Sequence, residues 1–434
     1  MEASVFVEAA KVGDLAKVQE LAPQCTDLNG GHALLWAAVG GHLPVVRFLV
    51  EQCAVDVEFA TENRASALVC AAMSGELAVV RYLAEQGGAD VNARTANGFT
   101  ALVVAARFGC TEVVRYLAEQ CDADGSATDE DGSSALLLAA ANGHMEVARY
   151  LVEHCGLDVD VKNTSGYTAL MGAARENHLE MVSYLVGQCG AAVEARNNGG
   201  TQHWRNEAGA TALMWAAATG RTEVVRCLAE ECGADVNAKN HDGNTVLMVA
   251  SKNDRIEIVR YLVEQRAADI SVKSNDGFTA LMLAARDGKL ELVRYLAEVS
   301  GENPNVVNEV LMWSATSASI EIVQYLVEHC GADVMSEDGA RAIIFASSHG
   351  NMEIVRYLVE QCGADVNVKD KCDGNTALMW AAHNDMRAVV QYLVEKSGAD
   401  VNAKSEGGAT AIMRAAAQER GFGIAFPDLI ITLP

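Results

Sequence analysis

Long apolar segments are missing from this sequence, and their absence excludes a membrane-spanning helix from the expected structure. No apolar run approaches the roughly 18 residues that a helix needs to cross a bilayer. The N-terminal segment Met1–Phe6 also lacks a basic stretch followed by an apolar core, the pattern of a secretory signal. We therefore expect a soluble, intracellular protein in the cytoplasm, with the nucleus as the alternative compartment and no membrane insertion.

Basic residues are also scarce. The chain of 434 residues has 33 lysines and arginines against 58 aspartates and glutamates, which gives a formal net charge of −25 at pH 7. Nucleic-acid binding needs a basic stripe that neutralises phosphates, and the sequence contains none. The acidic residues are distributed along the chain, so we interpret them as solvated surface. Nucleic acid is not an expected partner.

Signatures of catalysis and metal binding are absent as well. The sequence has no G-x-S-x-G, P-loop or H-E-x-x-H motif and no paired Cys/His constellation. It has twelve cysteines but no C-x-x-C pair, which argues against a metal site. We expect no enzyme activity, no cofactor and no metal.

The stretch Asn275–Glu298 shows how the chain is built. Gly277 follows Asn and Asp in a tight-turn signal, because glycine accepts a positive φ. Thr279 is a suitable N-cap for a short helix over Ala280–Arg286, and Leu290–Glu298 has the apolar spacing of a second helix. Helices this short are marginal in water on their own, so they need copies of themselves alongside.

The chain supplies these copies. The turn glycine recurs at spacings of 34 residues over most of the chain, and Thr-Ala-Leu-Met or a close variant follows it. We count eleven full copies and two partial ones between about Glu2 and Ala417. The recurring turn glycines are Gly98, Gly132, Gly166, Gly209, Gly243, Gly277, Gly339, Gly374 and Gly408.

These landmarks, with closing Gly-Ala-Asp-Val-Asn segments such as Gly88–Asn92 and Gly363–Asn367, resemble the ankyrin repeat family. The resemblance implies an all-α fold: an ankyrin-repeat solenoid of helix-turn-helix units with β-hairpin or turn fingers, stacked into a curved superhelix. The family motif T-P-L-H is mostly Thr-Ala-Leu-Met here, so the hydrogen bond that its histidine makes between repeats is lost. We interpret both changes as neutral for the fold.

The repeats predict four segments along the chain. Two fingers depart from the pattern, with an insertion at 197–205 and an irregular finger at 302–309 where the turn glycine and capping threonine are missing. The four segments are a degenerate N-terminal capping repeat at 1–29, about eight ankyrin repeats at 30–307, about three at 308–404, and a truncated last repeat with an irregular apolar tail at 405–434.

Three residue types recur at one register of the second helices. Seven cysteines end these helices; copies in adjacent repeats would lie roughly 8–10 Å apart, too far for a disulfide, so we expect free thiols. Nine of the ten tyrosines share another register, which we interpret as packing between repeats. Glu-Arg-Glu at i, i+3 and i+7 predicts exposed helix faces with intrahelical ion pairs.

Residues that vary within the constant frame are the candidates for function. In ankyrin repeats the hairpin tips and the groove bind partner proteins, and the resemblance implies the same role here. Aromatic and arginine side chains are the types that dominate binding hot spots, and the insertion carries an unexpected tryptophan. The candidate partner-binding residues are Phe99, Arg107, Phe108, Tyr167, Arg175, Glu176, Trp204, Phe278, Arg286, Asp287 and His383.

The expected function is a non-enzymatic scaffold, a monomer that binds an unidentified partner protein through its concave groove and hairpin tips. Two alternatives stay open. The repeats are part of a longer protein whose catalytic or effector domain lies outside this chain, or they form a structural spacer without a specific partner. The resemblance also implies four Asp-Val-Asn sites for an asparaginyl hydroxylase: Asn92, Asn237, Asn367 and Asn402.

Overall fold

The computed structural model describes residues 2–24, 27–199, 208–301 and 303–419. The described chain is a succession of short helix pairs, which confirms the all-α fold expected from the repeats. Contacts divide the chain into two compact units, which we call unit 1 (Met1–Asp242) and unit 2 (Gly243–Pro434) and describe separately.

Unit 1 begins with a helix pair, as the capping repeat predicted, and continues with six more. Its second pair is preceded by a 3₁₀ turn, and its last helix ends in a π-helical turn that we label η2. The elements are α1 (Glu2–Lys11), α2 (Leu15–Leu21), η1 (Ala22–Gln24), α3 (Asp27–Val39), α4 (Leu43–Glu51), α5 (Ala67–Ser74), α6 (Leu77–Glu85), α7 (Ala101–Arg107), α8 (Thr111–Gln120), α9 (Ala135–Ala141), α10 (Met145–Glu153), α11 (Ala169–Arg175), α12 (Leu179–Gly187), α13 (Ala212–Thr219), α14 (Thr222–Arg226) and η2 (Cys227–Glu231).

Unit 2 repeats the same arrangement. The second helix of one of its pairs also ends in a π-helical turn, η4, and a 3₁₀ turn precedes α21. The elements are α15 (Val246–Lys252), α16 (Ile256–Arg266), α17 (Ala280–Arg286), α18 (Leu290–Ser300), α19 (Pro304–Ser314), α20 (Ile320–Glu328), η3 (Gly339–Arg341), α21 (Ala342–His349), α22 (Met352–Arg356), η4 (Tyr357–Gln361), α23 (Ala377–His383), α24 (Arg387–Glu395) and α25 (Ala411–Glu419).

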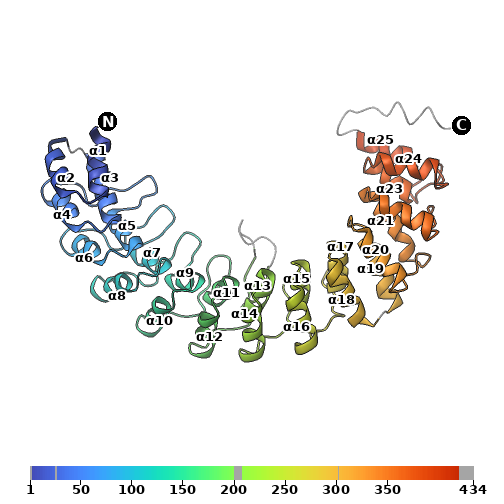
Figure 1. The fold of residues 1–434 in the computed structure, drawn as a ribbon, viewed down its shortest axis with the longest axis horizontal. Coiled ribbons are helices and arrows are strands. Elements are labelled where there is room, and N and C mark those ends of the chain that lie inside the picture. Colours follow the sequence, from blue (N-terminus) through green and yellow to red (C-terminus); the bar gives the residue numbers. More distant parts are fainter. Residues whose placement is uncertain (1, 25–26, 200–207, 302, 420–434) are drawn as a thin grey trace. The chain divides into compact units, whose positions relative to one another are not determined.

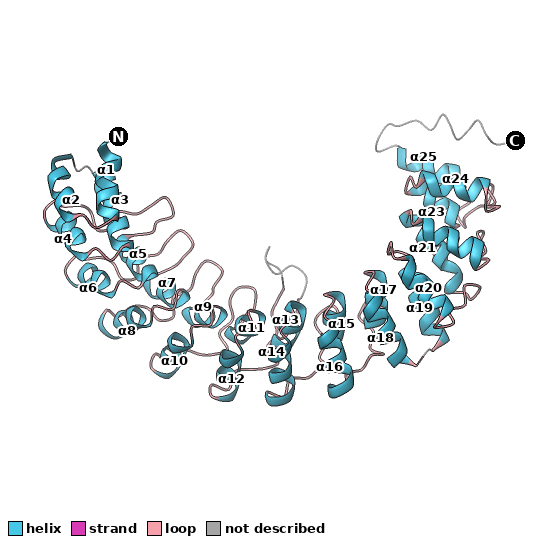
Figure 2. Cartoon of the chain, viewed as in Figure 1, coloured by secondary structure: helices cyan, strands magenta, loops and turns pink. Residues whose placement is uncertain are grey.

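The first helices of successive pairs pack on one another within each unit, and so do the second helices. Figure 1 shows α5, α7, α9 and α11 following one another along one side of unit 1, with α6, α8, α10 and α12 along the other. The loops between pairs extend on the side of the first helices (Figure 2). The buried core consists mainly of alanine, leucine and valine from both sets of helices.

The threonine before each first helix acts as an N-cap, as the sequence predicted for Thr279. Its hydroxyl accepts a hydrogen bond from Met282 N at 3.3 Å. Because these helix starts are buried, the hydroxyl supplies an acceptor where water is excluded. The threonines that cap in this way are Thr100, Thr168, Thr211, Thr245, Thr279 and Thr376.

The fingers are turns rather than extended hairpins. In the part of the chain that the structure describes, β-structure is limited to two isolated antiparallel bridges, Ala60 with Ser66 and Thr128 with Ser134. Gly98 has φ +79, and a Cβ there would lie 2.8 Å from Glu130 N of the next finger. The turn therefore needs glycine both for its backbone conformation and for the close approach of the neighbouring repeat.

The carbonyl groups that end the first helices are bonded by the next repeat. His144 Nε2 lies 3.0 Å from Arg107 O, and His178 Nε2 lies 3.1 Å from Ala141 O. These carbonyls have no partner inside their own helix, so the neighbouring repeat completes the helix end. Asn351 makes the corresponding bond in unit 2, from Nδ2 to Ala315 O at 2.9 Å.

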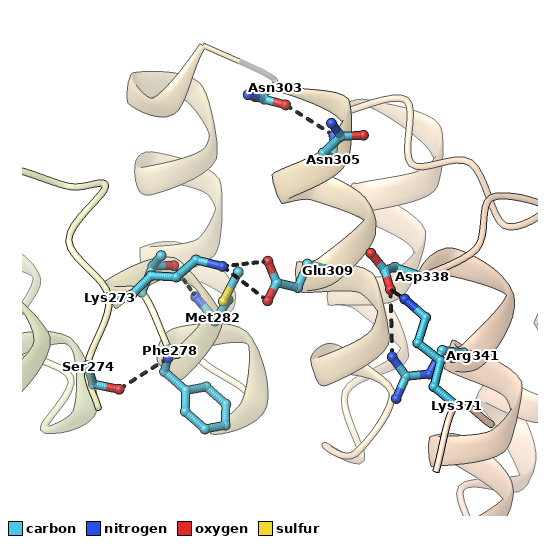
Figure 3. A network of polar contacts seen from close by, with 11 residues as sticks. Lys273, Ser274, Phe278, Met282, Asn303, Asn305, Glu309, Asp338, Arg341 and Lys371 are labelled. Atoms are coloured by element: carbon cyan, nitrogen blue, oxygen red, sulfur yellow. Dashed lines mark hydrogen bonds and ion pairs between the residues drawn. The ribbon is translucent and has the colours of Figure 1, made fainter. Parts of the chain in front are cut away.

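Unit 2 departs from the predicted irregular finger at 302–309. Most of this stretch is helix, because α19 begins at Pro304 and replaces the finger altogether. The Asn303 side chain accepts a hydrogen bond from Asn305 N at 3.1 Å (Figure 3), and proline is well tolerated at the first helical position. The prediction of an irregular finger was wrong since it overlooked this Asn-Pro helix start.

The longer α19 keeps its contacts with both neighbours in unit 2. Lys273 Nζ lies 3.0 Å from Glu309 Oε2 across the place of the missing finger (Figure 3). The Trp313 ring lies 4.6 Å from that of Phe278 and 5.3 Å from that of Phe345. Aromatic packing at these distances stabilises the stack, so the lost finger leaves the first helices in contact.

Gly339 does not act as a turn glycine, contrary to the sequence prediction. It lies in the 3₁₀ turn η3 and has no positive φ. A Cβ at this position would lie 2.0 Å from Asp333 O, so glycine is required there for close backbone packing. The spacing was correct, but the structural role of the glycine differs.

The second helices are joined by a repeated contact that we call the rung. Tyr116 donates its hydroxyl to Glu85 Oε1 at 2.9 Å, and the Arg81 guanidinium lies 5.0 Å from the Tyr116 ring centre. The tyrosine belongs to one repeat, whereas the glutamate and arginine belong to the repeat before it. The same hydroxyl–carboxylate bond joins Tyr82–Glu51, Tyr116–Glu85, Tyr150–Glu119, Tyr184–Glu153, Tyr295–Glu264, Tyr357–Glu328 and Tyr392–Glu360.

The rung revises the interpretation of the Glu-Arg-Glu pattern. Intrahelical ion pairs were expected, and Arg260–Glu264 forms one at 3.9 Å. The arginine and glutamate also contact the aromatic ring and the hydroxyl of the next repeat. Their charge pattern therefore serves contacts between repeats.

One interface lacks all three members of the rung. Where α8 and α10 supply arginine, glutamate and tyrosine, α12 has Ser183 and Gly187 and the next second helix has Cys227. Ser183 Oγ lies 3.5 Å from Cys227 Sγ, and the Cys227 and Cys232 sulfur atoms lie 3.9 Å apart. The inserted finger lies between these two second helices in the sequence, so the interface that spans the insertion has no rung.

Restoring the missing rung should stabilise unit 1. We expect Ser183→Arg, Gly187→Glu and Cys227→Tyr together to raise the free energy of unfolding by roughly 1–2 kcal/mol, through a hydroxyl–carboxylate bond and a cation–π contact. A glutamate fits, because a Cβ on Gly187 would have no heavy atom within 4 Å. The measurement is urea unfolding, with Cys227→Phe as the matched control. A triple variant no more stable than Cys227→Phe would contradict the role of the rung.

The rung should also make stability fall at alkaline pH. Burial, followed by the hydrogen bond to glutamate, raises the pKa of Tyr295 and of Tyr392 to about 12, against an unfolded value of about 10. A raised native pKa contributes stability that is complete below pH ~10 and is lost as the pH rises through ~12. We expect the urea midpoint to fall over this window, and to fall less in Tyr295→Phe. Native phenolate absorbance rising fully at pH ~10 would contradict this assignment.

Candidate functional site

A groove of about 670 Å³ lies in unit 1 over α7, α9 and α11 and the fingers beside them. It brings together five of the predicted partner-binding residues, which come from two repeats separated by a third. The lining residues are Asn97, Phe99, Arg107, Asp129, Glu130, Asp131, Ser133, Leu137, Leu138, Ala141, Asn142, Asn163, Tyr167, Gly172, Arg175 and Glu176.

The groove lining includes a glycine of α11, Gly172, which is buried. Gly172 occupies the position of Leu138 in α9 and Trp215 in α13. A Cβ built there would lie 3.0 Å from Ala141 Cβ, so a side chain would fill the space. Sequence reasoning missed Gly172, although a glycine inside a helical pattern is a signal for close packing or function.

Arg107 and its aromatic neighbours form one wall of the groove. The guanidinium lies 5.3 Å from the Phe99 ring centre and 5.9 Å from that of Phe108. Phe108 is 50% exposed, a large apolar ring in water next to a cation. Phe99, Arg107 and Phe108 therefore lie together in the structure. Aromatic rings next to an arginine are suited to contact with a partner protein.

Arg175 and Glu176 lie further along the same wall. The Arg175 Nη1 atom lies 3.3 Å from Glu176 Oε1, and both side chains are partly exposed. Arg175 O also accepts hydrogen bonds from Thr219 Oγ1 at 3.2 Å and Arg221 Nε at 3.0 Å. The end of α11 is therefore held by the next repeat while its charged side chains stay at the groove.

Tyr167 does not present its ring at a finger tip, contrary to the sequence expectation. Its side chain is 3% exposed, and its hydroxyl donates to Met171 O at 3.2 Å. The ring contacts that of Trp215 edge-on, with centres 5.6 Å apart, and burial raises the pKa of the phenol above its usual value. Tyr167 is a neutral packing residue under the groove rather than an exposed anchor.

Three consecutive carboxylates stand at the finger tip facing the arginines. Asp129 Oδ1 accepts a hydrogen bond from Ser133 N at 2.7 Å, whereas the side chains of Glu130 and Asp131 are exposed. Burial and the nearby Asp131 charge raise the pKa of Asp129, and its bond from Ser133 opposes that shift. In the described part of the chain, no lysine or arginine nitrogen lies within 4 Å of these three carboxylates.

The candidates of unit 2 form a separate cluster. Arg286 Nε lies 2.9 Å from Asp287 Oδ1, and its guanidinium lies 5.1 Å from the Phe278 ring centre. Figure 3 shows the Phe278 side chain beside α19, where it packs against Trp313. His383 ends α23, with its ring edge-on to Trp380 at 5.8 Å. The insertion residue Trp204 lies outside the described residues.

The predicted hydroxylation sites are exposed, and the side chains of Asn92 and Asn367 bond to the following repeat. Asn92 Oδ1 accepts from Asp124 N at 2.9 Å, and Asn367 Oδ1 accepts from Asp400 N at 2.8 Å. A modifying enzyme would therefore reach the side chain, but it would meet a carbonyl already used between repeats. Hydroxylation stays a prediction for Asn92, Asn237, Asn367 and Asn402.

Other kinds of site are not found in the described residues. They contain no group of three or more His, Cys, Asp or Glu side chains placed to hold a metal ion. The cysteines that the structure describes are free thiols. None of the helices in the described segments has the length and hydrophobicity required to cross a lipid bilayer.

Paired helices that repeat along the chain, linked by turn fingers and lined by a groove, define a helical repeat protein. The sequence model for ankyrin repeats (3 copies) matches this chain in overlapping segments that together run from residue 6 to residue 421. The segments are 6–95, 53–129, 83–163, 120–197, 196–274, 232–309, 267–338, 311–405 and 343–421. The chain belongs to the ankyrin repeat family, which is a non-catalytic family of generally protein-binding scaffolds. No curated protein matches the chain.

The two aromatic candidates Phe278 and Phe108 should respond differently to truncation. Phe278 packs against Trp313, so Phe278→Ala should lower the free energy of unfolding by about 2–4 kcal/mol. Phe108 is half exposed, so Phe108→Ala should change it by less than about 1 kcal/mol. Urea unfolding of both variants makes the comparison. Equal losses would show that Phe278 is as free as Phe108 to contact a partner.

Proposed function

We propose that this chain is a non-enzymatic scaffold that binds a partner protein through the groove of unit 1. The observation that supports this most is the convergence of Phe99, Arg107, Arg175 and Glu176 on one groove of about 670 Å³. Their rings and charges are held in place by the repeats, so little side-chain freedom is lost when a partner binds. Aromatic and arginine side chains in such a setting are typical of binding hot spots.

The cluster of Phe278, Arg286 and Asp287 is a weaker candidate for the same role. Its phenylalanine contacts α19, and its arginine is paired with the adjacent aspartate. Both features favour a structural role for the cluster within unit 2. The groove of unit 1 is therefore the surface to test first.

We also propose that the chain acts as a monomer in the cytoplasm or nucleus. Free thiols at every described cysteine suit a reducing compartment. The repeats as part of a longer protein, and the spacer without a specific partner, remain the alternatives. The spacer predicts that no captured protein depends on the groove residues.

Replacing groove residues should abolish partner capture without unfolding the repeats. We expect Phe99→Ala with Arg107→Ala to weaken partner binding by at least ~2 kcal/mol, about 30-fold in Kd, with a small change in thermal stability. Affinity purification with mass spectrometry, using the intact chain as bait, identifies proteins that the wild type retains and this variant loses. Titration of the purified partner then gives the change in Kd.

The matched control replaces one apolar and one acidic residue at the start of α12. Leu179→Ala with Glu180→Ala changes partly exposed residues that do not line the groove. It should leave capture unchanged. If both variants retain the same proteins, the groove of unit 1 is not the binding surface.

A further inference from the structure

The groove of unit 1 has a niche with chemically different sides. Its floor is apolar and is lined by Leu138, Ala141 and Gly172, where a Cβ would lie 3.0 Å from Ala141 Cβ. The finger side carries Asp129, Glu130 and Asp131, and the helix side carries the two arginines with Glu176. A ligand that fits must therefore offer both apolar and charged surface.

The two arginines on the helix side of the groove already contact neighbouring side chains. The Arg107 guanidinium lies over two phenylalanine rings, and Arg175 is paired with Glu176 at 3.3 Å. The finger side is different, because no described lysine or arginine pairs with its three carboxylates. Four carboxylates and two guanidinium groups line the groove, so its field favours a cation.

The other described fingers of unit 1 do not offer this combination. The equivalent tips carry Glu62-Asn63-Arg64, Ala96-Asn97-Gly98 and Thr164-Ser165-Gly166, each with one acidic residue or none. The three consecutive carboxylates lie in the finger that directly precedes α9. This helix packs against α11, the helix that carries Gly172. The acidic finger tip and the glycine in the groove floor therefore line the same groove.

We propose that this niche accepts one lysine or arginine side chain from an extended segment of the partner protein. The inference rests on the proposed scaffold function and specifies the chemistry of its ligand. The aliphatic stem of the basic side chain lies on Leu138 and the space left by Gly172, and its cationic head reaches the carboxylates of Glu130 and Asp131. A long basic side chain combines these two parts in one residue.

Arg107 then acts on the backbone of the same segment. An extended segment exposes carbonyl groups on either side of the inserted residue, and the Arg107 guanidinium at the groove wall is a donor for them. Phe108 offers an exposed ring for a neighbouring apolar side chain. The partner sequence expected is a short extended stretch with one basic residue and an apolar neighbour.

A random dodecapeptide library displayed on phage tests this with the intact chain as target. We expect the selected peptides to share one lysine or arginine. Synthetic fluorescent copies should bind with an affinity that falls with salt, since the contact includes exposed carboxylates. Replacing the basic residue by norleucine should weaken binding at least about tenfold.

Two variants of the chain test the two sides of the niche separately. Glu130→Gln with Asp131→Asn should weaken the selected peptide at least about tenfold and reduce the salt dependence. Gly172→Ala should weaken it by adding a methyl group to the niche, and because that Cβ would lie 3.0 Å from Ala141 Cβ, its thermal unfolding is measured beside the binding. The matched control, Glu62→Gln with Asp242→Asn, changes acidic residues at the same tip positions of other fingers and should leave binding unchanged.

The outcomes separate this inference from the scaffold function on which it rests. Peptides that are acidic or lack a shared basic residue would overturn the inference, as would equal binding to the Glu130→Gln, Asp131→Asn variant. If peptides without a shared basic residue bind the wild type but not the Phe99→Ala, Arg107→Ala variant, the scaffold function is supported. The inference of a basic ligand is then wrong. A library that yields no peptide dependent on either variant would overturn both.

Discussion

The structure depends on one constraint: no helix pair can bury its apolar faces by itself. Each first helix is seven to eight residues long in most repeats, and its alanine and leucine side chains are covered by the neighbouring pairs. The polar groups follow the same rule. Helix-end carbonyls, finger amides and tyrosine hydroxyls find their partners in the adjacent repeat. Stability in such a chain resides mainly in the interfaces between repeats.

This distribution explains why local departures matter more than repeat count. The finger is missing near residue 302, but α19 extends into that place and keeps its packing through Trp313. The interface between α12 and the following second helix is different. It has lost Arg, Glu and Tyr together, and Ser183 meets Cys227 there instead. The hydroxyl–carboxylate bond persists without the arginine in Tyr357–Glu328, where Gln324 takes the arginine position, whereas the α12 interface has neither the bond nor the arginine.

The same constraint leaves the groove free to vary. Side chains at the ends of the first helices and at the finger tips contribute little to burial, so they differ from repeat to repeat while the frame stays constant. In unit 1 this freedom has produced Gly172 beside a run of three carboxylates and two arginines. One finger supplies three of the carboxylates that line the groove, and α11 supplies the glycine. The helices of these repeats still pack on their neighbours.

The sequence by itself determined the repeat, the helix pairs and several N-caps, because a 34-residue period and a threonine before many of the first helices are local signals. It also indicated Phe99, Arg107 and Arg175 as candidates from their variation within the frame. The sequence could not determine which of these side chains contact one another in the folded protein. Tyr167 and Phe99 occupy the same position in their repeats, yet Tyr167 is buried beneath Trp215 whereas Phe99 lines the groove under Arg107.

Tertiary structure alone decided the partners of the charged second helices and the role of the irregular segments. The Glu-Arg-Glu pattern fits intrahelical pairs as well as contacts with the next repeat, and the choice follows from the position of a tyrosine 31 residues away. Gly339 keeps the period but not the turn, since Asp333 O lies too close for any other residue. Periodicity specifies which residues are equivalent; the identity of their neighbours, and hence their function, depends on packing between repeats.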